Sequence, residues 1–132
     1  MRSSILPHRS PSAFIGCLMV IGLTTSCSLV ASVDDGPSEA YKQELADHLS
    51  EAGVTMYGAH WCYHCADQKA LFGEAVKAIP YVECDPEGEN AQPELCQAKA
   101  LPGYPTWEVN GELYPGVYSL TELAKLSDFP AP

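Results

Sequence analysis

The chain has 132 residues, of which 46% are hydrophobic, and its 17 acidic residues outnumber 7 basic ones to give a formal net charge of −10. This length suits one small domain with a leader, and the apolar content excludes a disordered chain. Both arginines lie near the N-terminus, and every acidic residue follows Val33. The acidic chain after Val33 argues against nucleic-acid binding, because a phosphate backbone requires a basic surface. We interpret the acidity as a contribution to solubility.

Residues 1–27 have the order of an export signal, with a polar stretch containing two arginines, an apolar run and then small residues. The apolar run, Ala13–Leu23, is shorter than the roughly 20 residues of a membrane span. Three fates stay open: lipidation of Cys27, whose surroundings resemble a bacterial lipoprotein site, cleavage nearby without a lipid, and retention as a membrane anchor. All three place the domain outside the cytosol, where disulfides persist.

One domain is predicted over residues 39–132, after a polar linker at 28–38. Hydrophobic periodicity and breaker residues predict its elements in chain order. They are a helix from Ser38 to about Gly53, a strand at 54–59, a helix from about Cys62 to Ile79, a strand at 81–84, a loop at 85–93, a short helix at 94–100, a hairpin with strands at 107–109 and 112–114, and a last helix that begins at Ser119. A β-α-β unit followed by a hairpin and a helix describes an α/β thioredoxin-like fold, with a small mixed sheet and flanking helices.

Local signals set several of these boundaries. Ser119 and Glu122 have the spacing of a capping box, and Asn110–Gly111 is the favoured two-residue hairpin turn because both positions need a positive φ. Gly73 weakens the middle of the long helix by about 1 kcal/mol relative to alanine. His48 of the first helix is expected to face solvent. The apolar face of the long helix is expected to contain Leu71, Ala75 and Ile79.

Cys62 and Cys65 carry the chemistry of the chain. Two cysteines two residues apart, between a strand and a helix, can exchange two electrons between thiols and a disulfide. The positive end of the helix and its free N–H groups favour the thiolate of Cys62, and the thiolate is the attacking species in disulfide exchange. We expect Cys62 to be exposed and to attack, and Cys65 to be buried and to resolve the mixed disulfide. The alternatives are an inert disulfide and half of a zinc site, although zinc usually takes its four ligands from two such pairs.

These motifs, in this order, resemble the thioredoxin-like domain fused to bacterial and plant homologues of vitamin K epoxide reductase. The resemblance covers roughly residues 55–129. The segments that carry it are 57–65, 67–69, 71–73, 81–84 and 104–107. It implies a thiol-disulfide oxidoreductase with the Cys62–Cys65 disulfide as its redox group, and we expect no metal and no other cofactor.

The resemblance also implies disulfide exchange with client proteins and with a quinone-linked four-helix membrane enzyme. The chain has no four-helix segment, so we expect the soluble half as a separate monomer in the periplasm or the thylakoid lumen, in contact with the membrane only through its leader. An oxidase and a reductase that delivers electrons outward would use the same residues. A non-catalytic binding module, with a purely structural Cys62–Cys65 bridge, is the alternative from another class. Tyr63 and His60 depart from the family pattern and leave the redox potential and the partner open.

Two histidines and two tryptophans lie near the cysteine pair or in the motifs that accompany it. His64 is expected to stabilise the Cys62 thiolate, with an exposed ring of no tuning role as the alternative, and His60 is a weaker candidate for the same role. Trp61 and Trp107 are expected to form an apolar collar for a substrate chain, although Trp107 equally suits the core.

Thioredoxin-like folds place a cis-proline opposite the redox pair, and Pro105 matches that position. A cis bond is plausible only before proline. The resemblance implies that the backbone groups of Tyr104 and Thr106 face a bound peptide and pair with it as a strand would.

Cys84 and Cys96 are expected to form a structural disulfide, which would contribute roughly 3 kcal/mol by closing a loop of about a dozen residues. A second redox pair that relays electrons to Cys62 and Cys65 is the alternative. Thioredoxins and disulfide isomerases carry a buried carboxylate six residues before the first cysteine, where it assists the resolving thiol. Met56 occupies that position here, so slower or differently assisted resolution is expected.

Overall fold

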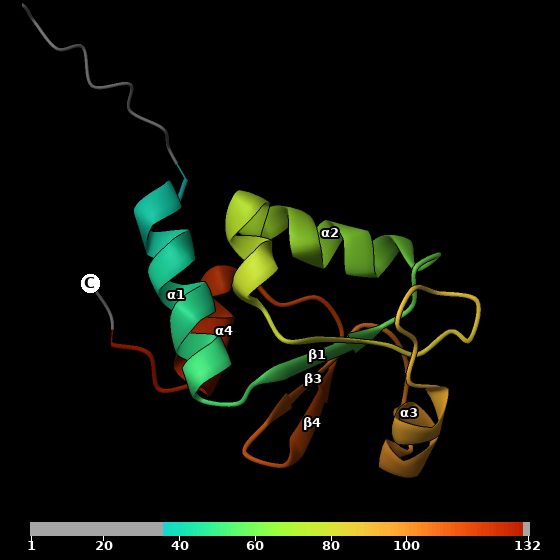
Figure 1. The fold of residues 1–132 in the computed structure, drawn as a ribbon. Helices are drawn as coiled ribbons and strands as arrows, with labels where there is room; N and C mark the ends of the chain where they lie inside the picture. The colour runs from blue at the N-terminus through green and yellow to red at the C-terminus, as the bar shows by residue number, and fades with distance from the viewer. Residues whose placement is uncertain (1–35, 131–132) are drawn as a thin grey trace, which may run out of the picture. The chain divides into compact units, whose positions relative to one another are not determined.

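The computed structural model describes residues 36–130, which contain a mixed four-stranded sheet in the order β2-β1-β3-β4 (Figure 1). The elements are α1 (Glu39–Glu51), β1 (Thr55–Gly58), α2 (Tyr63–Phe72), the 3₁₀ helix η1 (Gly73–Ala78), β2 (Tyr81–Glu83), α3 (Pro93–Lys99), β3 (Thr106–Val109), β4 (Glu112–Pro115) and α4 (Leu120–Leu126). β1 runs parallel to β2 and antiparallel to β3, and β3 and β4 form the predicted hairpin. The α/β thioredoxin-like fold is confirmed.

The predicted export signal at 1–27, with Cys27, and most of the predicted linker at 28–38 lie outside the described residues. Within residues 36–130, no helix combines the length and the apolar character needed to cross a bilayer.

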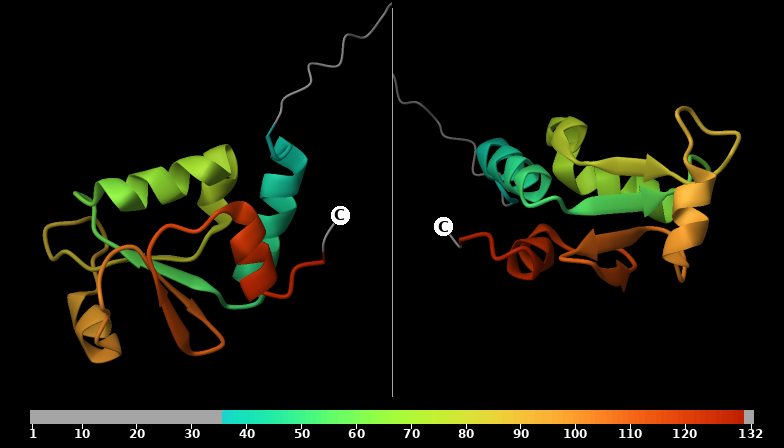
Figure 2. Two further views of the ribbon diagram at one scale, coloured as in Figure 1. Left: turned by 180° about the vertical axis from the view of Figure 1, so that it is seen from behind. Right: turned by 60° about the horizontal axis from the view of Figure 1, so that its bottom comes forward.

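Neighbouring residues of a strand face opposite sides of the sheet and enter two hydrophobic clusters. Met56 of β1 and Trp107 of β3 belong to the main core, which they share with α1, α2 and α4. Tyr57 and Val82 belong to a smaller cluster that contains the buried cysteine of α3, Cys96. Figures 1 and 2 accordingly show α1, α2 and α4 grouped together and α3 apart from them.

Side-chain caps and one turn fix the ends of several elements as predicted. Ser38 accepts a hydrogen bond from the Tyr41 N–H at 3.2 Å and so caps α1. Ser119 and Glu122 form the capping box at the start of α4. The Asn110–Gly111 turn has φ angles of 52° and 84°, both positive as the hairpin requires.

The helix predicted from Cys62 to Ile79 is wrong in its second half. α2 ends at Phe72, Gly73 adopts a φ of 57°, and residues 73–78 form the 3₁₀ helix η1. Glycine has no Cβ to oppose a positive φ, so the α-helix ends here at little steric cost. Leu71 is 40% exposed in consequence, and Phe72 occupies the core in place of Leu71. The other two residues expected on the apolar face are buried as predicted.

His48 does not face solvent as expected, because the C-terminal segment of the chain packs against it. The His48 Nε2 atom lies 2.7 Å from the Ser127 carbonyl oxygen, and its ring lies 5.1 Å from the Phe129 ring between centroids. His48 therefore joins α1 to the end of α4.

Gln68 of α2 is fully buried and ties α2 to the sheet. Its Oε1 atom accepts hydrogen bonds from the Trp107 Nε1–H at 3.2 Å and from the Tyr118 N–H at 2.7 Å. Its Nε2 atom donates to the Tyr118 carbonyl at 3.0 Å. One amide thus satisfies polar groups on β3 and on the segment after β4, which holds the helix of the cysteine pair in place.

Replacing Gln68 with leucine, a residue of similar size, is expected to lower the free energy of unfolding by about 2 kcal/mol, because the Trp107 and Tyr118 donors lose their acceptor. Urea denaturation measures the effect. Gln43→Leu is the matched control, since Gln43 bonds only with exposed Asp47, and it should change stability by less than about 0.5 kcal/mol. Equal losses in the two variants would contradict this role for Gln68.

Candidate active site

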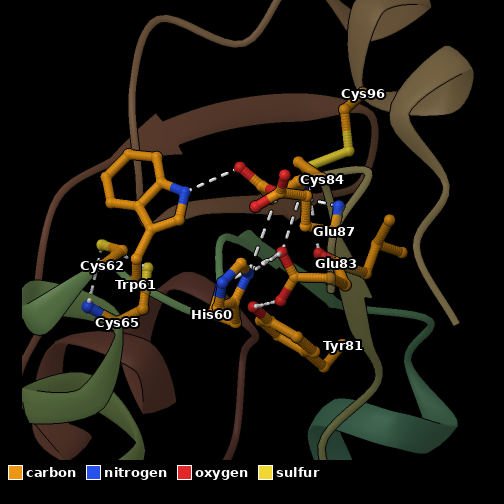
Figure 3. A network of polar contacts seen from close by, with 11 residues as sticks. His60, Trp61, Cys62, Cys65, Tyr81, Glu83, Cys84, Glu87 and Cys96 are labelled. Carbon is orange, nitrogen blue, oxygen red and sulfur yellow. Dashed lines mark hydrogen bonds and ion pairs between the residues drawn. A yellow bond between two sulfur atoms is a disulfide. The ribbon is translucent and has the colours of Figure 1, made fainter. Parts of the chain in front are cut away.

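Cys62 lies where β1 ends and α2 begins. β1 stops at Gly58, and the Cys62 N–H closes the following turn by donating to the Ala59 carbonyl at 3.0 Å. Cys62 is the N-cap of α2, because its sulfur accepts a hydrogen bond from the Cys65 N–H at 3.2 Å. The cysteine pair therefore sits at the carboxyl end of the first strand, where open α/β sheets hold their sites (Figure 3).

Cys62 and Cys65 are both free thiols, and their sulfurs lie 2.6 Å apart, with the Cys65 thiol donating to the Cys62 sulfur. Cys65 is 1% exposed, as predicted. Cys62 was expected to be exposed but is only 7% exposed, because its side chain turns inward to cap α2. Its neighbours Trp61 and Tyr63 are the exposed residues, at 62% and 71%.

Burial raises the pKa of the Cys65 thiol to about 12, and its hydrogen bond to Cys62 acts in the same direction. A backbone hydrogen bond with Ala59 and the charge of Lys69 oppose the rise without cancelling it. Cys65 therefore keeps its proton at neutral pH and needs assistance to act as a nucleophile.

In the reduced protein near neutral pH, iodoacetamide is expected to label Cys62 and to leave Cys65 unmodified, because alkylation requires a thiolate. Labelling of Cys65 should rise only as the pH climbs toward its pKa of about 12. Peptide mapping by mass spectrometry measures both sites. The same protein in concentrated urea is the control and should label at both. Equal labelling of the two cysteines in the folded protein would overturn the assignment of Cys65 as the protonated partner.

Trp61 lies over the site and is held by a neighbouring loop. Its Nε1–H donates to an Asp85 carboxylate oxygen at 2.8 Å, and its ring meets the Tyr104 ring edge-on with centroids 6.3 Å apart. The hydrogen bond from Trp61 lowers the pKa of Asp85, and the Glu87 N–H adds to this effect. Trp61 and Tyr104 thus present aromatic surface beside the pair, and their contact with a substrate stays a prediction.

His64 is exposed on the first turn of α2. Its ring lies 4.0 Å from the Tyr63 ring between centroids, and its Nδ1 atom lies 4.0 Å from an Asp67 oxygen. These contacts place it at the rim of the site, and its tuning of the Cys62 thiolate stays a prediction.

The Tyr104–Pro105 peptide bond is cis, as predicted. His64, Tyr104 and Pro105 line a cavity of about 250 Å³, together with Gly116 and Val117. The surface of this cavity is mostly carbon, which would suit an apolar group.

Burial corrects one predicted substrate contact, at Thr106, and decides between the two alternatives for Trp107. Thr106 is fully buried within β3, and its hydroxyl donates to the Gly103 carbonyl at 2.7 Å. β3 lies between β1 and β4, so the backbone of Thr106 pairs with neighbouring strands of the sheet and not with a bound peptide. Trp107 is also fully buried and bonds to Gln68. Thr106 therefore shapes the turn before β3, and Trp107 belongs to the core and not to a collar.

Cys84 and Cys96 form a disulfide that joins the end of β2 to α3. With these sulfurs bonded to each other, they cannot complete a zinc site with Cys62 and Cys65. No group of three or more histidine, cysteine or acidic side chains suited to a metal ion occurs within residues 36–130. Whether the disulfide also relays electrons stays a prediction.

The double variant Cys84→Ser/Cys96→Ser is expected to lose roughly 3 kcal/mol of stability, because the bridge closes a loop with a sequence separation of 12. Denaturant unfolding measures the loss. A folded double variant should keep its thiol-exchange activity if the bridge is structural. Loss of that activity in a folded variant would instead support the relay.

Glu83 is a site residue that sequence reasoning missed. It is 6% exposed at the end of β2 and accepts three hydrogen bonds. The His60 and Asp85 N–H groups donate to its Oε1 atom, each at 3.0 Å, and the Tyr81 hydroxyl donates to Oε2 at 2.8 Å (Figure 3). An acidic residue within a predicted short strand, two positions after a tyrosine, was the available signal. His60 itself is exposed, and its Nδ1 atom lies 3.9 Å from both Glu83 and Asp85.

No family model matches the chain. The chain is similar to the thiol-disulfide oxidoreductase LTO1 of Arabidopsis thaliana, with 43% identity over 96 residues. This region covers 70% of the chain and 26% of the relative. The chain thus spans about a quarter of the length of this relative.

Proposed function

We propose that this chain, which belongs with the thioredoxin-like domains of the vitamin K epoxide reductase homologues, is an exported thiol-disulfide oxidoreductase that cycles Cys62 and Cys65 between dithiol and disulfide. One observation carries the proposal: the Cys62 sulfur accepts hydrogen bonds from both the N–H and the thiol of Cys65 at the start of α2. The name of the relative, a thiol-disulfide oxidoreductase, supports the same activity.

The geometry supports different steps for the two sulfurs. Cys62, the acceptor and the more accessible sulfur, attacks a client disulfide, whose S–S bond breaks as a mixed disulfide forms and one client thiolate leaves. Cys65 then loses its proton and attacks the Cys62 sulfur, which forms the Cys62–Cys65 disulfide and releases the second client thiolate. Two electrons pass from the pair to the client. The reverse sequence oxidises a client dithiol.

The client chain would bind at the aromatic and apolar surface beside the pair. The Trp61 ring is exposed and the Tyr104 ring is half-buried. The two rings are in contact, and Tyr104 also lines the small cavity at Pro105. We propose that these three residues contact the client, while His64 at the cavity rim tunes the Cys62 sulfur.

The partner and the compartment are also proposals. The family resemblance supports a quinone-linked four-helix membrane enzyme as the redox partner, with the direction of electron flow toward disulfide formation in client proteins. The export-like leader and the Cys84–Cys96 disulfide support an oxidising compartment such as the periplasm or the thylakoid lumen. Lipidation at Cys27 would tether a monomeric domain to the membrane there.

Cys62→Ser is expected to abolish both insulin reduction and oxidative refolding of a reduced substrate, because the variant lacks the attacking sulfur. Circular dichroism should show an unchanged fold, since serine also caps helices. If neither assay responds to the substitution, the proposed activity is wrong.

A redox titration separates the oxidoreductase from a binding module with an inert bridge. A potential below about −300 mV would mark a structural disulfide and contradict the proposal. A potential between about −120 and −180 mV would favour the oxidising direction, and a value near about −270 mV would favour the reducing one.

A further inference from the structure

The resolving thiol lacks the acid that thioredoxins place on the strand before the redox pair. Met56 occupies this position and is buried in the core. Cys65 nevertheless has to lose and regain a proton in every cycle, and burial works against its ionisation. Some other group has to carry that proton.

The neighbouring strand supplies a hydroxyl at this point. Tyr81 of β2 is the register partner of Met56, so both side chains lie on the face of the sheet that α2 covers. Gly58 has no Cβ and so leaves a small space beside the Tyr81 side chain and Cys65. A Cβ built on Gly58 would lie 2.9 Å from the Cys65 sulfur and 3.1 Å from the Tyr81 hydroxyl oxygen, so both atoms converge on one small space.

The hydroxyl is in turn bonded to a carboxylate. The Tyr81 hydroxyl donates to the Glu83 Oε2 atom at 2.8 Å, and two backbone N–H groups hold Oε1. Glu83 pairs in register with Gly58, so the carboxylate lies on the same face of the sheet as the hydroxyl. Figure 3 shows Tyr81, Glu83 and His60 together on one side of the cysteine pair.

We propose that Tyr81 and Glu83 form the proton-transfer pair of the resolving cysteine, replacing the acid that Met56 lacks. This inference rests on the proposed oxidoreductase function and deepens it. The Tyr81 hydroxyl adjoins the same space at Gly58 as the reacting sulfur, and Glu83 acts through Tyr81 as a positioning residue and proton acceptor.

The proton balance of the resolving step follows from this arrangement. The Cys65 thiol gives its proton to the Tyr81 oxygen while the tyrosine proton passes to Glu83, so the phenol stays neutral and the carboxylate becomes protonated. The Cys65 sulfur then bonds to the Cys62 sulfur, and the client leaves as a thiolate. Glu83 returns the proton to solvent at the exposed His60 side of the network. When a client dithiol is oxidised, the same protons move in reverse.

The surrounding charges favour this assignment. Burial and Glu83 raise the pKa of Tyr81, so the phenol remains a proton donor and relay and does not ionise. The other titratable groups that face the path are Cys62 and Lys69 of α2, Tyr104 before β3, and His60 and Asp85 beside Glu83. The Lys69 Nζ atom lies over the Tyr81 ring, 3.4 Å from its centroid.

The reaction of the reduced protein with an aromatic disulfide, 5,5′-dithiobis(2-nitrobenzoate), tests the inference. Attack by Cys62 releases the first coloured thiolate, and resolution by Cys65 releases the second, so stopped-flow absorbance separates the steps. Glu83→Gln and Tyr81→Phe are expected to slow the second phase about tenfold or more near neutral pH, with the first phase changed less than about twofold. The deficit should shrink as the pH rises and hydroxide takes the Cys65 proton instead.

Tyr57→Phe is the matched control, because the Tyr57 hydroxyl also bonds to a glutamate, Glu108, at 2.7 Å, but on the other face of the sheet. It should leave both phases unchanged. An unchanged second phase in Tyr81→Phe, which keeps the aromatic ring in the core, overturns the proton-transfer pair, as does a slowing that is equal at every pH. A wild-type protein without a second phase would contradict the proposed function itself, which is a distinct result.

Discussion

Two hydrogen bonds from Cys65 converge on the Cys62 sulfur, one from its backbone N–H at 3.2 Å and one from its thiol at 2.6 Å. The first exists because Cys62 is the N-cap of α2, and a helix start leaves its first N–H groups unpaired. The same geometry makes one sulfur an acceptor and the other a donor. Gln68, one turn after Cys65, fixes the position of α2 against β3 and so preserves the asymmetry.

A second constraint acts from the sheet. Where β1 and β2 run side by side, Gly58 leaves room for the Cys65 sulfur and for the Tyr81 side chain to approach each other. The Tyr81 hydroxyl leads to the buried Glu83 carboxylate, which lies next to the exposed His60. The resolving sulfur is thus shielded from solvent and shares one small space with the hydroxyl that we propose as its proton relay.

Much of the fold could be predicted because its signals are local. The caps at Ser38 and Ser119 and the Asn110–Gly111 turn each depend on a few adjacent residues, and the structure confirms them. The cysteine pair and the Cys84–Cys96 disulfide were also predicted. The end of α2 before Gly73 was not, because an isolated glycine within a helical pattern is tolerated at a cost of about 1 kcal/mol and so does not by itself mark a helix end.

Most of what sequence reasoning missed depends on tertiary contacts. Thr106 is buried because strands flank it on both sides, and Glu83 gains the His60 N–H as a partner only where β2 meets the loop after β1. Cys62 differs, because it is buried by a local contact, the cap of its own helix. A mixed-disulfide trap tests most directly the central claim that Cys62 attacks the client and Cys65 resolves the mixed disulfide. Cys65→Ser incubated with an oxidised client should accumulate a covalent adduct that peptide mapping places on Cys62. An adduct on Cys65 in the Cys62→Ser variant, or no adduct in either variant, would contradict the account.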